Sequence, residues 1–440
     1  MQDQPVIDPN KKPPHGRNMA PPCPPKTHGS NRQRQGRSEL PEGWRWVKLG
    51  DVCKIEAKLV DPKISEYGAL PHVNGQNIAS ETCQIKYLNT AAQEGMTSNK
   101  YLFESGSVLY SKLRPYLRKA AFADFRGLCS ADMYPLQVVQ GAISPQYLTW
   151  LLVSDDFTSY ADEESRRSRM PKLNRRQLFS WETPLPPLNE QKRIVAILSD
   201  RLAAVEQARL AAEAQLEAAT ALPAAYLRQV FDSPEAQKWE KKALGDVAKV
   251  GSGITLGRKF KEDVATRRVP YLRVANVKDG YLDLSDITAT EATESEISKC
   301  LLQYGDILLT EGGDPDKLGR GTYWQNELME CIHQNHIFRV RFDLSDYVPS
   351  FISAQIGSSY GKSYFLSHAK QTTGIATINQ RVLKGFPLAS PPVEIQKEIV
   401  SRLENELRKA EEIKKLLQDQ LDTINALPAA LLRQAFNGEL

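Results

Sequence analysis

The chain carries two copies of one stretch, first as Ala221-Leu222-Pro223-Ala224-Ala225-Tyr226-Leu227-Arg228-Gln229-Val230-Phe231. The second copy, 205 residues later, is Ala426-Leu427-Pro428-Ala429-Ala430-Leu431-Leu432-Arg433-Gln434-Ala435-Phe436 and differs at two positions only. The same offset, without a gap, places Gln191-Lys192 on Gln396-Lys397 and Ile194-Val195 on Ile399-Val400. A match of this length at one offset indicates an internal duplication.

The duplication extends toward the N-terminus at slightly different offsets, as surface loops of unequal length produce. Leu49-Gly50-Asp51-Val52 matches Leu244-Gly245-Asp246-Val247, and Gly106-Ser107-Val108-Leu109 matches Gly305-Asp306-Ile307-Leu308. We therefore expect two copies of one unit, each with a globular part of roughly 145 residues followed by a helical part. The expected boundaries are a tail at 1–40, globular domains at 41–186 and 234–391, and helical segments at 187–233 and 392–440.

Each helical segment has an apolar seam whose positions step alternately by three and four residues, the spacing of a coiled coil. The first seam is Val195, Leu198, Leu202, Val205, Arg209, Ala212, Leu216 and Ala219. The second is Val400, Leu403, Leu407, Ala410, Lys414, Leu417, Leu421 and Ile424, with a basic residue at the same place. One interpretation is a helix lying on its own domain. A helix of over 30 residues, about 50 Å long, overshoots such a domain, so we favour two helices packed antiparallel on each other.

Prolines predict where these helices begin and end. The pairs at 186–187 and 391–392 suit helix entries. Pro223 and Pro428 are expected to break the long helices near their ends, leaving separate helical turns after them. In the globular parts, 106–110, 306–310 and 337–342 predict strands, and 145–160 and 349–368 predict helices. The predicted class is α+β, with two tandem domains, two paired helices and pseudo-twofold symmetry.

Composition and charge exclude several classes of protein. With 41% hydrophobic and 25% charged residues, the 440-residue chain is neither collagen-like nor disordered throughout. No run approaches the ~18 apolar residues of a membrane span, so no membrane partner is expected. Six cysteines without CxxC spacing predict reduced thiols in a cytoplasmic protein. Residues 1–40 carry seven basic and three acidic side chains, which alone equals the net charge of +4, and their proline-rich composition predicts disorder.

Motifs for catalysis and metal binding are absent from the sequence or too weak to assign. The stretch 357–363 is one residue short of a phosphate-binding loop and follows a helical pattern. Cys331, His333 and His336 lack a second pair of ligands nearby, so no metal is assigned. A glycine-rich cofactor loop and the Asn-Pro-Pro-aromatic tetrad of an adenine methyltransferase do not occur. We therefore predict no catalytic residues.

Basic side chains in both globular parts remain as candidates for contacts with DNA phosphates. Six of them lie within the eleven positions 166–176, more than solubility requires. The bland interpretation is that many are simply solvated. The candidates in the first domain are Lys112, Arg114, Arg118, Lys119, Arg166, Arg167, Arg169, Lys172, Arg175 and Arg176. Those in the second are Arg258, Lys259, Lys261, Arg267, Arg268, Arg273, Lys317, Arg320, Lys370 and Arg381.

The duplicated Pro-Pro-x-x-x-Gln-Lys-x-Ile-Val entries, the long helices and the closing Arg-Gln-x-Phe resemble the specificity subunit of Type I restriction-modification enzymes. The resemblance covers residues 41–440 and is most specific at 184–195 and 432–440. It implies two target-recognition domains that each read half of a bipartite duplex DNA sequence, with helices as spacer and docking surface. It also implies two modification subunits as partners, joined by restriction/translocase subunits.

The resemblance assigns S-adenosylmethionine, ATP and Mg to those partner subunits, and no cofactor to this chain. Two other interpretations remain open at this point. One is a coiled-coil assembly scaffold that does not bind DNA, and the other is an enzyme with an unrecognised site. Binding to duplex DNA that depends steeply on salt would distinguish a DNA-reading subunit from the assembly scaffold, because phosphate contacts release counterions.

Overall fold

The computed structural model describes residues 40–80, 82–166, 171–261, 263–314, 318–372, 375–437 and 439–440. The chain divides into two compact units. Unit 1 extends to Ala204 and also contains Leu427–Leu440, whereas unit 2 is Val205–Ala426. Of the expected tail at 1–40, all but the last residue lies outside the described residues.

The globular part of unit 1, here called domain 1, runs from β1 to β11 and combines three sheets with short helices. β1 (Arg45–Lys48) pairs antiparallel with β11 (Glu182–Leu185). A four-stranded sheet has the order β2 (Cys53–Ile55), β10 (Met133–Val138), β7 (Ser107–Ser111) and β8 (Ala120–Ala123). A five-stranded sheet has the order β3 (Lys58–Val60), β6 (Lys100–Phe103), β9 (Gly127–Cys129), β4 (Pro71–Val73) and β5 (Asn89–Thr90). The helices are α1 (Leu49–Val52), α2 (Ser65–Gly68), η1 (Pro115–Leu117), α3 (Pro145–Leu151), α4 (Asp155–Ser165) and α5 (Arg175–Ser180).

The globular part of unit 2, domain 2, runs from β12 to β23. β12 (Lys241–Ala243) pairs with β23 (Pro387–Ala389). The four-stranded sheet has the order β13 (Ala248–Ser252), β20 (Ile337–Phe342), β16 (Ile307–Thr310) and β18 (Gly321–Tyr323). Two three-stranded sheets have the orders β15 (Thr288–Ala292), β14 (Arg267–Leu272), β19 (Ile332–His333), and β17 (Gly312–Gly313), β22 (Ile375–Thr377), β21 (Lys370–Thr372). The helices are α7 (Pro234–Lys238), α8 (Leu244–Val247), η2 (Val274–Asn276), α9 (Glu294–Cys300), α10 (Pro349–Gly357), α11 (Ser359–His368) and α12 (Gln380–Lys384).

The strand pairing of the two domains follows one plan. The four-stranded sheets are antiparallel in the same order, and in each domain one further pair is parallel, β4 with β9 and β14 with β19. Register makes the positions equivalent one by one: Val108 and Ile307 face Leu136 and Val340 in their sheets. The duplication read in the sequence is therefore a duplication of topology.

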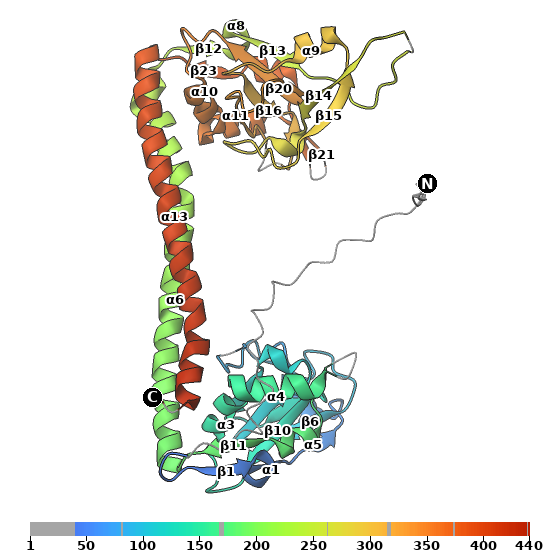
Figure 1. Cartoon of the computed structure of the whole chain (residues 1–440), viewed down its shortest axis with the longest axis vertical. Helices are drawn as coiled ribbons and strands as arrows, with labels where there is room; N and C mark the ends of the chain where they lie inside the picture. The colour runs from blue at the N-terminus through green and yellow to red at the C-terminus, as the bar shows by residue number, and fades with distance from the viewer. Residues whose placement is uncertain are drawn as a thin grey trace, which may run out of the picture. The chain divides into compact units, whose positions relative to one another are not determined.

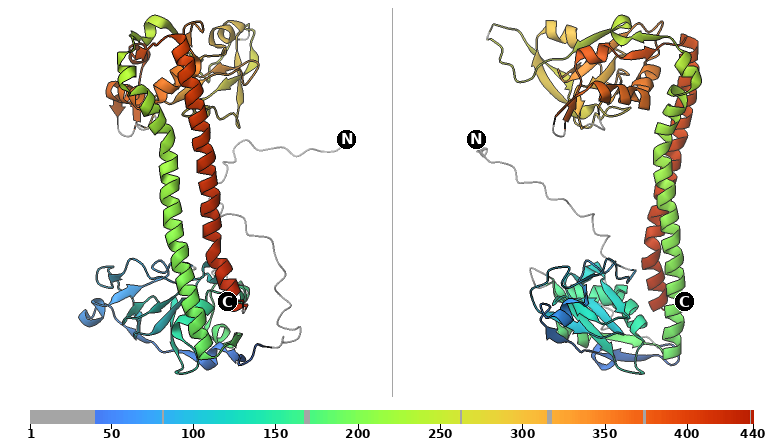
Figure 2. Two further views of the ribbon diagram at one scale, coloured as in Figure 1. Left: turned by 90° about the vertical axis from the view of Figure 1, so that its left-hand side faces the viewer. Right: turned by 180° about the vertical axis from the view of Figure 1, so that it is seen from behind.

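The long helices are α6 (Leu188–Phe231) and α13 (Val393–Phe436). In unit 2, Ala212 packs in one apolar cluster with Leu421 and Ile424, while Val230 shares a core with Ile399 and Leu403. Later residues of α6 thus meet earlier residues of α13, so the two helices lie side by side and antiparallel within this unit (Figures 1 and 2). In unit 1, Leu198 near the start of α6 packs with Leu432 near the end of α13.

Most of the predicted seam is removed from solvent. Its buried members are Leu198, Ala212, Ala219, Leu403, Ala410, Leu421 and Ile424. The half-buried members are Val195, Leu202, Val205, Arg209, Leu216, Val400, Leu407, Lys414 and Leu417. The guanidinium of Arg209 bonds Glu206 and Glu213 of its own helix, so this polar seam residue keeps its charge paired at the edge of the contact.

The expectation that Pro223 and Pro428 break the long helices is wrong. Both prolines lie inside continuous 44-residue helices. Proline removes one backbone hydrogen bond and crowds the carbonyl four residues earlier, but packing on either side can outweigh that cost. Here the residues after each proline are held in a core, Val230 and Phe231 in domain 2 and Leu432 and Ala435 in domain 1.

The predicted helices at 145–160 and 349–368 each form two helices. In the first pair, Ser154 separates α3 from α4, because its side chain accepts the N–H of Phe157 and caps the start of α4. Ser358 does the same for α11 through the N–H of Gly361. A serine that accepts an N–H at a helix start favours a new helix over continuation of the old one. The predicted strands at 106–110, 306–310 and 337–342 are confirmed as β7, β16 and β20.

In the described part of the chain, none of the helices combines the length and the apolar character needed to cross a membrane.

Candidate nucleic-acid interface

In domain 1, the segment after β7 lies against the segment before α5. The N–H of Leu173 donates to the carbonyl of Lys112 at 3.0 Å, and the N–H of Arg114 donates to the carbonyl of Pro171 at 2.9 Å. Two stretches that are about 60 residues apart in the sequence are therefore adjacent. This pairing brings together basic side chains from both, as expected for a phosphate-facing surface.

Four exposed cations form what we call the first basic cluster: Arg114, Lys172, Arg175 and Arg176. Arg114 has a positive φ of 51°, and its backbone is held by the hydrogen bond to Pro171. Arg175 reaches the hydroxyl of Tyr101 at 3.4 Å. Among the residues that the structure describes, no carboxylate forms an ion pair with any of the four, so their charges face solvent.

The other described candidates of domain 1 have partners within the chain. Arg118 pairs with Asp155 at 2.5 Å. Lys119 donates to the carbonyl of Gly75, and Arg166 pairs with Asp162 at 2.9 Å. Arg167 and Arg169 lie outside the described residues.

Lys112 differs from the other predicted contacts of domain 1 that the structure describes because it is buried. The residue is 7% exposed, its ammonium donates to the carbonyl of Ala131, and that ammonium lies 5.0 Å from the centre of the Tyr134 ring. Burial, followed by the nearby charge of Lys172, lowers the pKa of Lys112. With its ammonium already bonded to the backbone of Ala131, Lys112 is less available to a DNA phosphate than the exposed cations beside it.

In domain 2, three of the predicted cations are neutralised by carboxylates. Arg267 bonds both oxygens of Glu330, at 2.7 and 2.5 Å, and also bonds Glu294. These bonds hold the pKa of Glu330 below its usual range. Arg258 pairs with Glu296, and Arg273 pairs with Asp286 at 2.7 Å. The charges of these arginines are therefore offset by carboxylates of their own domain.

The remaining candidates of domain 2 are more scattered. The exposed ones are Lys259, Lys261, Arg268, Lys370 and Arg381, and none of them pairs with a carboxylate of the described residues. Arg320 is half-buried, and Lys317 lies outside the described residues. Arg381 occupies the position of Arg176, because each follows an asparagine that caps its helix, Asn379 for α12 and Asn174 for α5.

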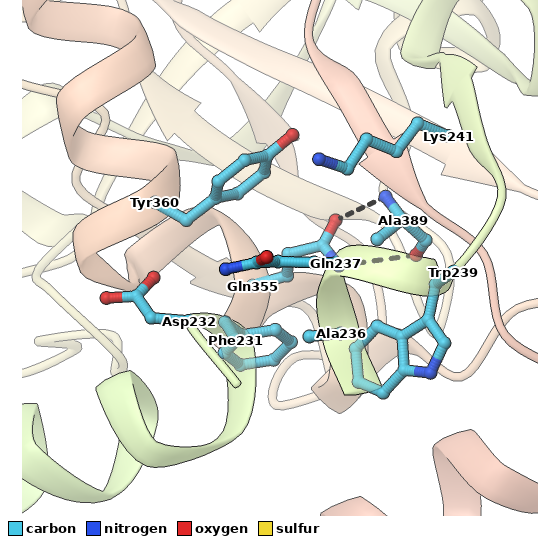
Figure 3. A pocket seen from close by; sticks show the side chains of 9 residues that line it. All are labelled: Phe231, Asp232, Ala236, Gln237, Trp239, Lys241, Gln355, Tyr360 and Ala389. Carbon is cyan, nitrogen blue, oxygen red and sulfur yellow. Dashed lines mark hydrogen bonds between the residues drawn. The ribbon is translucent and has the colours of Figure 1, made fainter. Parts of the chain in front are cut away.

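A cavity of about 200 Å³ lies in unit 2 where the end of α6 enters domain 2. Figure 3 shows the side chains around it, with the amide of Gln355 bonded twice to the backbone of Ala389. The ammonium of Lys241 lies 5.2 Å from the centre of the Tyr360 ring, and Asp232 accepts a hydrogen bond from Ser359. Gln355 and Asp232 are thus already bonded within the chain, and we assign the cavity no chemistry.

The residues considered for a metal lie in different environments. Cys331 and His333 are buried at β19, where the ring of His333 bonds the carbonyl of Ile337 at 3.0 Å. His336 is more exposed and bonds Glu311 at 2.6 Å. Within the described residues, no group of three or more potential metal-binding side chains occurs.

Sequence reasoning missed two kinds of residue. Tyr101, the partner of Arg175, is 74 residues away in the chain, and nothing local points to it. Gln191 and Gln396 are almost fully buried in the helix entries. Their exact match at the 205-residue offset was a visible signal, but a glutamine at a helix start is ordinarily a surface residue.

Comparison with known proteins identifies both halves of the chain. The family model described as "Type I restriction modification DNA specificity domain" matches residues 41–216 and 236–423. The Type I restriction enzyme EcoDI specificity subunit of Escherichia coli is 30% identical over 226 residues, which cover 51% of this chain and 50% of that protein. The alignment thus spans about half the length of this relative. The StySPI specificity subunit of Salmonella potsdam is 26% identical over 428 residues, or 92% of this chain and 90% of that protein.

Two solved structures share the fold. A chain from a study of complex assembly and conformational transition in the type I R-M system has a TM-score of 0.71 at 22% identity, covering 92% of this chain and all of that one. The HsdS subunit from Thermoanaerobacter tengcongensis has a TM-score of 0.61 at 22% identity, covering 92% of this chain and 99% of that one. At this identity the likeness concerns the arrangement of the elements.

Proposed function

This chain belongs to the family of Type I restriction-modification DNA specificity domains, and from that premise we propose that it is the DNA-reading subunit of such a system. Each of its two domains would recognise one half of a bipartite duplex DNA target. The chain would contribute sequence recognition and no catalytic group of its own.

One observation carries this proposal: the two family matches fall on two copies of one topology. Two like domains in one chain suit a target with two separate halves, each read by one domain. Exposed arginines at equivalent positions, Arg176 and Arg381, would contact phosphates in both halves. Such contacts position a protein on DNA, and side chains in the grooves then select the bases.

We further propose the partners and boundaries of the working complex. Target-recognition domains at 41–186 and 234–391 would be joined by the helical spacers 187–233 and 392–440. The helices would dock two modification subunits, and restriction/translocase subunits would complete the assembly, a role suggested by the R-M complex of the structural relative. S-adenosylmethionine, ATP and Mg would be bound by those partners, and the complex would act in the cytoplasm.

The decisive experiment is single-molecule methylome sequencing of cells that carry this chain together with its modification subunit. We expect one bipartite motif with a methylated adenine in each half. Cells with the modification subunit alone are the control and should lack the motif. A continuous motif, or methylation that does not depend on this chain, would contradict the proposal.

Binding measurements test the electrostatic part separately. The complex should bind duplex DNA with a steep dependence on salt, because phosphate contacts release counterions. Affinity that does not change with salt would favour an assembly scaffold that makes no contact with DNA.

A further inference from the structure

Gln191 connects the start of α6 to two other parts of domain 1. Its side-chain oxygen accepts the backbone N–H of Ser144, just before α3, at 2.8 Å. Its amide nitrogen donates to the carbonyl of Pro186 at 2.9 Å and to that of Ala142 at 3.5 Å. The residue is 0% exposed. One side chain therefore ties the end of the last strand, the entry to α3 and the first turn of α6.

Gln396 makes the same connections in unit 2. Its oxygen accepts the N–H of Val348, just before α10, at 2.9 Å. Its nitrogen donates to the carbonyl of Pro391 at 2.9 Å and to that of Asp346 at 3.0 Å. This residue is 1% exposed. The two joints agree in all three connections although the domains around them differ in sequence.

Apolar packing surrounds each joint. Ile194 and Leu198 on the next turns of α6 share the core of Tyr147 in domain 1, and Ile399 and Leu403 share the core of Phe351 in domain 2. Apolar burial is strong but has little directional preference, so packed surfaces can slide or rotate. Hydrogen bonds weaken steeply away from linear geometry. A buried amide with all its groups bonded therefore selects one angle between helix and domain.

We propose that Gln191 and Gln396 are positioning residues that fix the angle of each recognition domain on the helix that begins beside it. Through that angle they set the distance between half-sites that the protein accepts. This inference rests on the proposed reading of a bipartite DNA target. Neither residue touches DNA in this scheme, since both are buried inside their units.

A small rotation at the joint moves the recognition domain far enough to change the accepted spacer length. A domain of this size has a radius of about 20 Å. A rotation of about 10° at the joint, which lies at the edge of the domain, moves the centre of the domain by about 3.5 Å, close to one base-pair step of about 3.4 Å. Loss of the glutamine contacts should therefore admit spacers one base pair longer or shorter.

The experiment compares methylomes of cells carrying the modification subunit with the wild-type chain, Gln191→Ala or Gln396→Ala. The wild-type chain defines a spacer of n base pairs. We expect both variants to keep the two half-site sequences and to raise methylation at spacers of n ± 1, relative to n, by at least about tenfold. Gln191→Glu tests the donor role of the amide nitrogen. The carboxylate still accepts the N–H of Ser144, but it places an oxygen opposite the carbonyls of Pro186 and Ala142, where the nitrogen had donated. This variant should relax the spacer at least as much.

Gln207→Ala is the matched control, since Gln207 lies exposed on the same helix and should leave the spacer preference unchanged. Lower stability alone would reduce methylation at every spacer and leave the ratio of n ± 1 to n as in the wild type. An unchanged ratio, or complete loss of methylation in all Gln191 variants, would overturn the positioning role. If the wild-type chain gives no bipartite motif, the proposed function fails instead.

Discussion

Domains 1 and 2 share their strand order, yet they stabilise equivalent positions with different chemistry. In domain 1, the amide of Gln137 donates to the hydroxyl of Ser107 at 2.7 Å. In domain 2, Arg341 takes the place of Gln137 and Asp306 that of Ser107, joined by two hydrogen bonds of 2.6 Å. The topology depends on the backbone pairing and apolar positions that both copies keep. The polar groups between strands can therefore change without changing the fold.

The surface cations differ in the same way. Among the described residues, the first basic cluster of domain 1 has no acidic partners and lies on two adjacent segments. Domain 2 pairs Arg258, Arg267 and Arg273 with carboxylates, and its exposed candidates without such partners are spread along the chain. A paired arginine adds little net field at the surface, since its charge is cancelled nearby. Because its unpaired cations lie on two adjacent segments, domain 1 should contribute more of the salt-dependent affinity, although domain 2 also carries five exposed cations without a carboxylate partner among the described residues.

Exchange of a whole domain is the largest change that tests this comparison. Replacing residues 41–186 by the equivalent domain of a related subunit should change one half of the methylated motif and leave the other half intact. Each altered base pair is worth about 1–3 kcal/mol, so the switch in that half should be complete. Methylome sequencing reads both halves at once. A change in both halves would show that the domains do not act as independent modules.

The second test concerns the buried polar pairs. Arg341→Ala leaves the carboxylate of Asp306, 0% exposed, without its charged partner, which should destabilise domain 2 by about 3–5 kcal/mol. The equivalent Gln137→Ala in domain 1 removes a neutral hydrogen bond and should cost about 1 kcal/mol. Hydrogen exchange of β16 and β20, against β7 and β10, measures each domain in the full chain. Equal losses would mean that the two pairs contribute alike.

Acid should also destabilise domain 2 more than domain 1, because His333 of domain 2 occupies the position of Cys129 in the parallel strand pair. Burial, with the charge of Arg339, lowers the pKa of His333 to about 4, whereas burial raises the pKa of Cys129 to about 12. An unfolded histidine has a pKa near 6.5. Between about pH 6.5 and 4 the unfolded chain therefore binds a proton that the folded chain does not bind. The free energy of unfolding consequently falls as the pH falls.

The expected loss across that window is about 3 kcal/mol for domain 2. His333→Asn keeps a donor for the carbonyl of Ile337 but cannot titrate. Urea unfolding at pH 7.5 and 4.5, followed by pulsed hydrogen exchange of the strands around β19, should show a smaller loss in this variant than in the wild type. The same acid sensitivity in both proteins would exclude His333 as its source.

The smallest expected effect is at the DNA surface. Arg114→Ala and Arg176→Ala should each weaken binding several-fold on all sequences and reduce the salt slope by about 1. Arg267→Ala in domain 2 should leave the slope nearly unchanged, since two glutamates already hold that side chain. Affinity measured at several salt concentrations distinguishes them. A loss of slope in Arg267→Ala would mean that this arginine leaves its glutamates for DNA.

Much of the fold could be predicted from the sequence because the same motifs and the same apolar seam occur in both copies of the duplicated unit. The heptad seam with Arg209 and Lys414 in register indicated paired helices, and strands such as Ile337–Phe342 alternate clearly. The effect of Pro223 could not be predicted in the same way. Whether a helix continues past proline depends on the packing of residues such as Phe231, which is tertiary information.

The candidate site was less predictable, for a related reason. Whether a basic residue is free depends on partners far away in the sequence, such as Glu330 for Arg267, 63 residues later. Lys112 looked like a surface residue in a basic segment, yet it is buried against Tyr134. Local composition predicts how much charge a segment carries, but it does not predict which charges are neutralised.

The division of the chain has a consequence for synthesis on the ribosome. Leu432 and Ala435 belong to the core of unit 1, but they are translated after the whole of unit 2. At about 5–20 residues per second, domain 1 waits about 10–50 seconds for these side chains. Domain 2 has Val230 and Phe231 from α6 before its own strands emerge. The domain that is made first is therefore the last to complete its core, and until then it exposes the apolar surface that the end of α13 will cover.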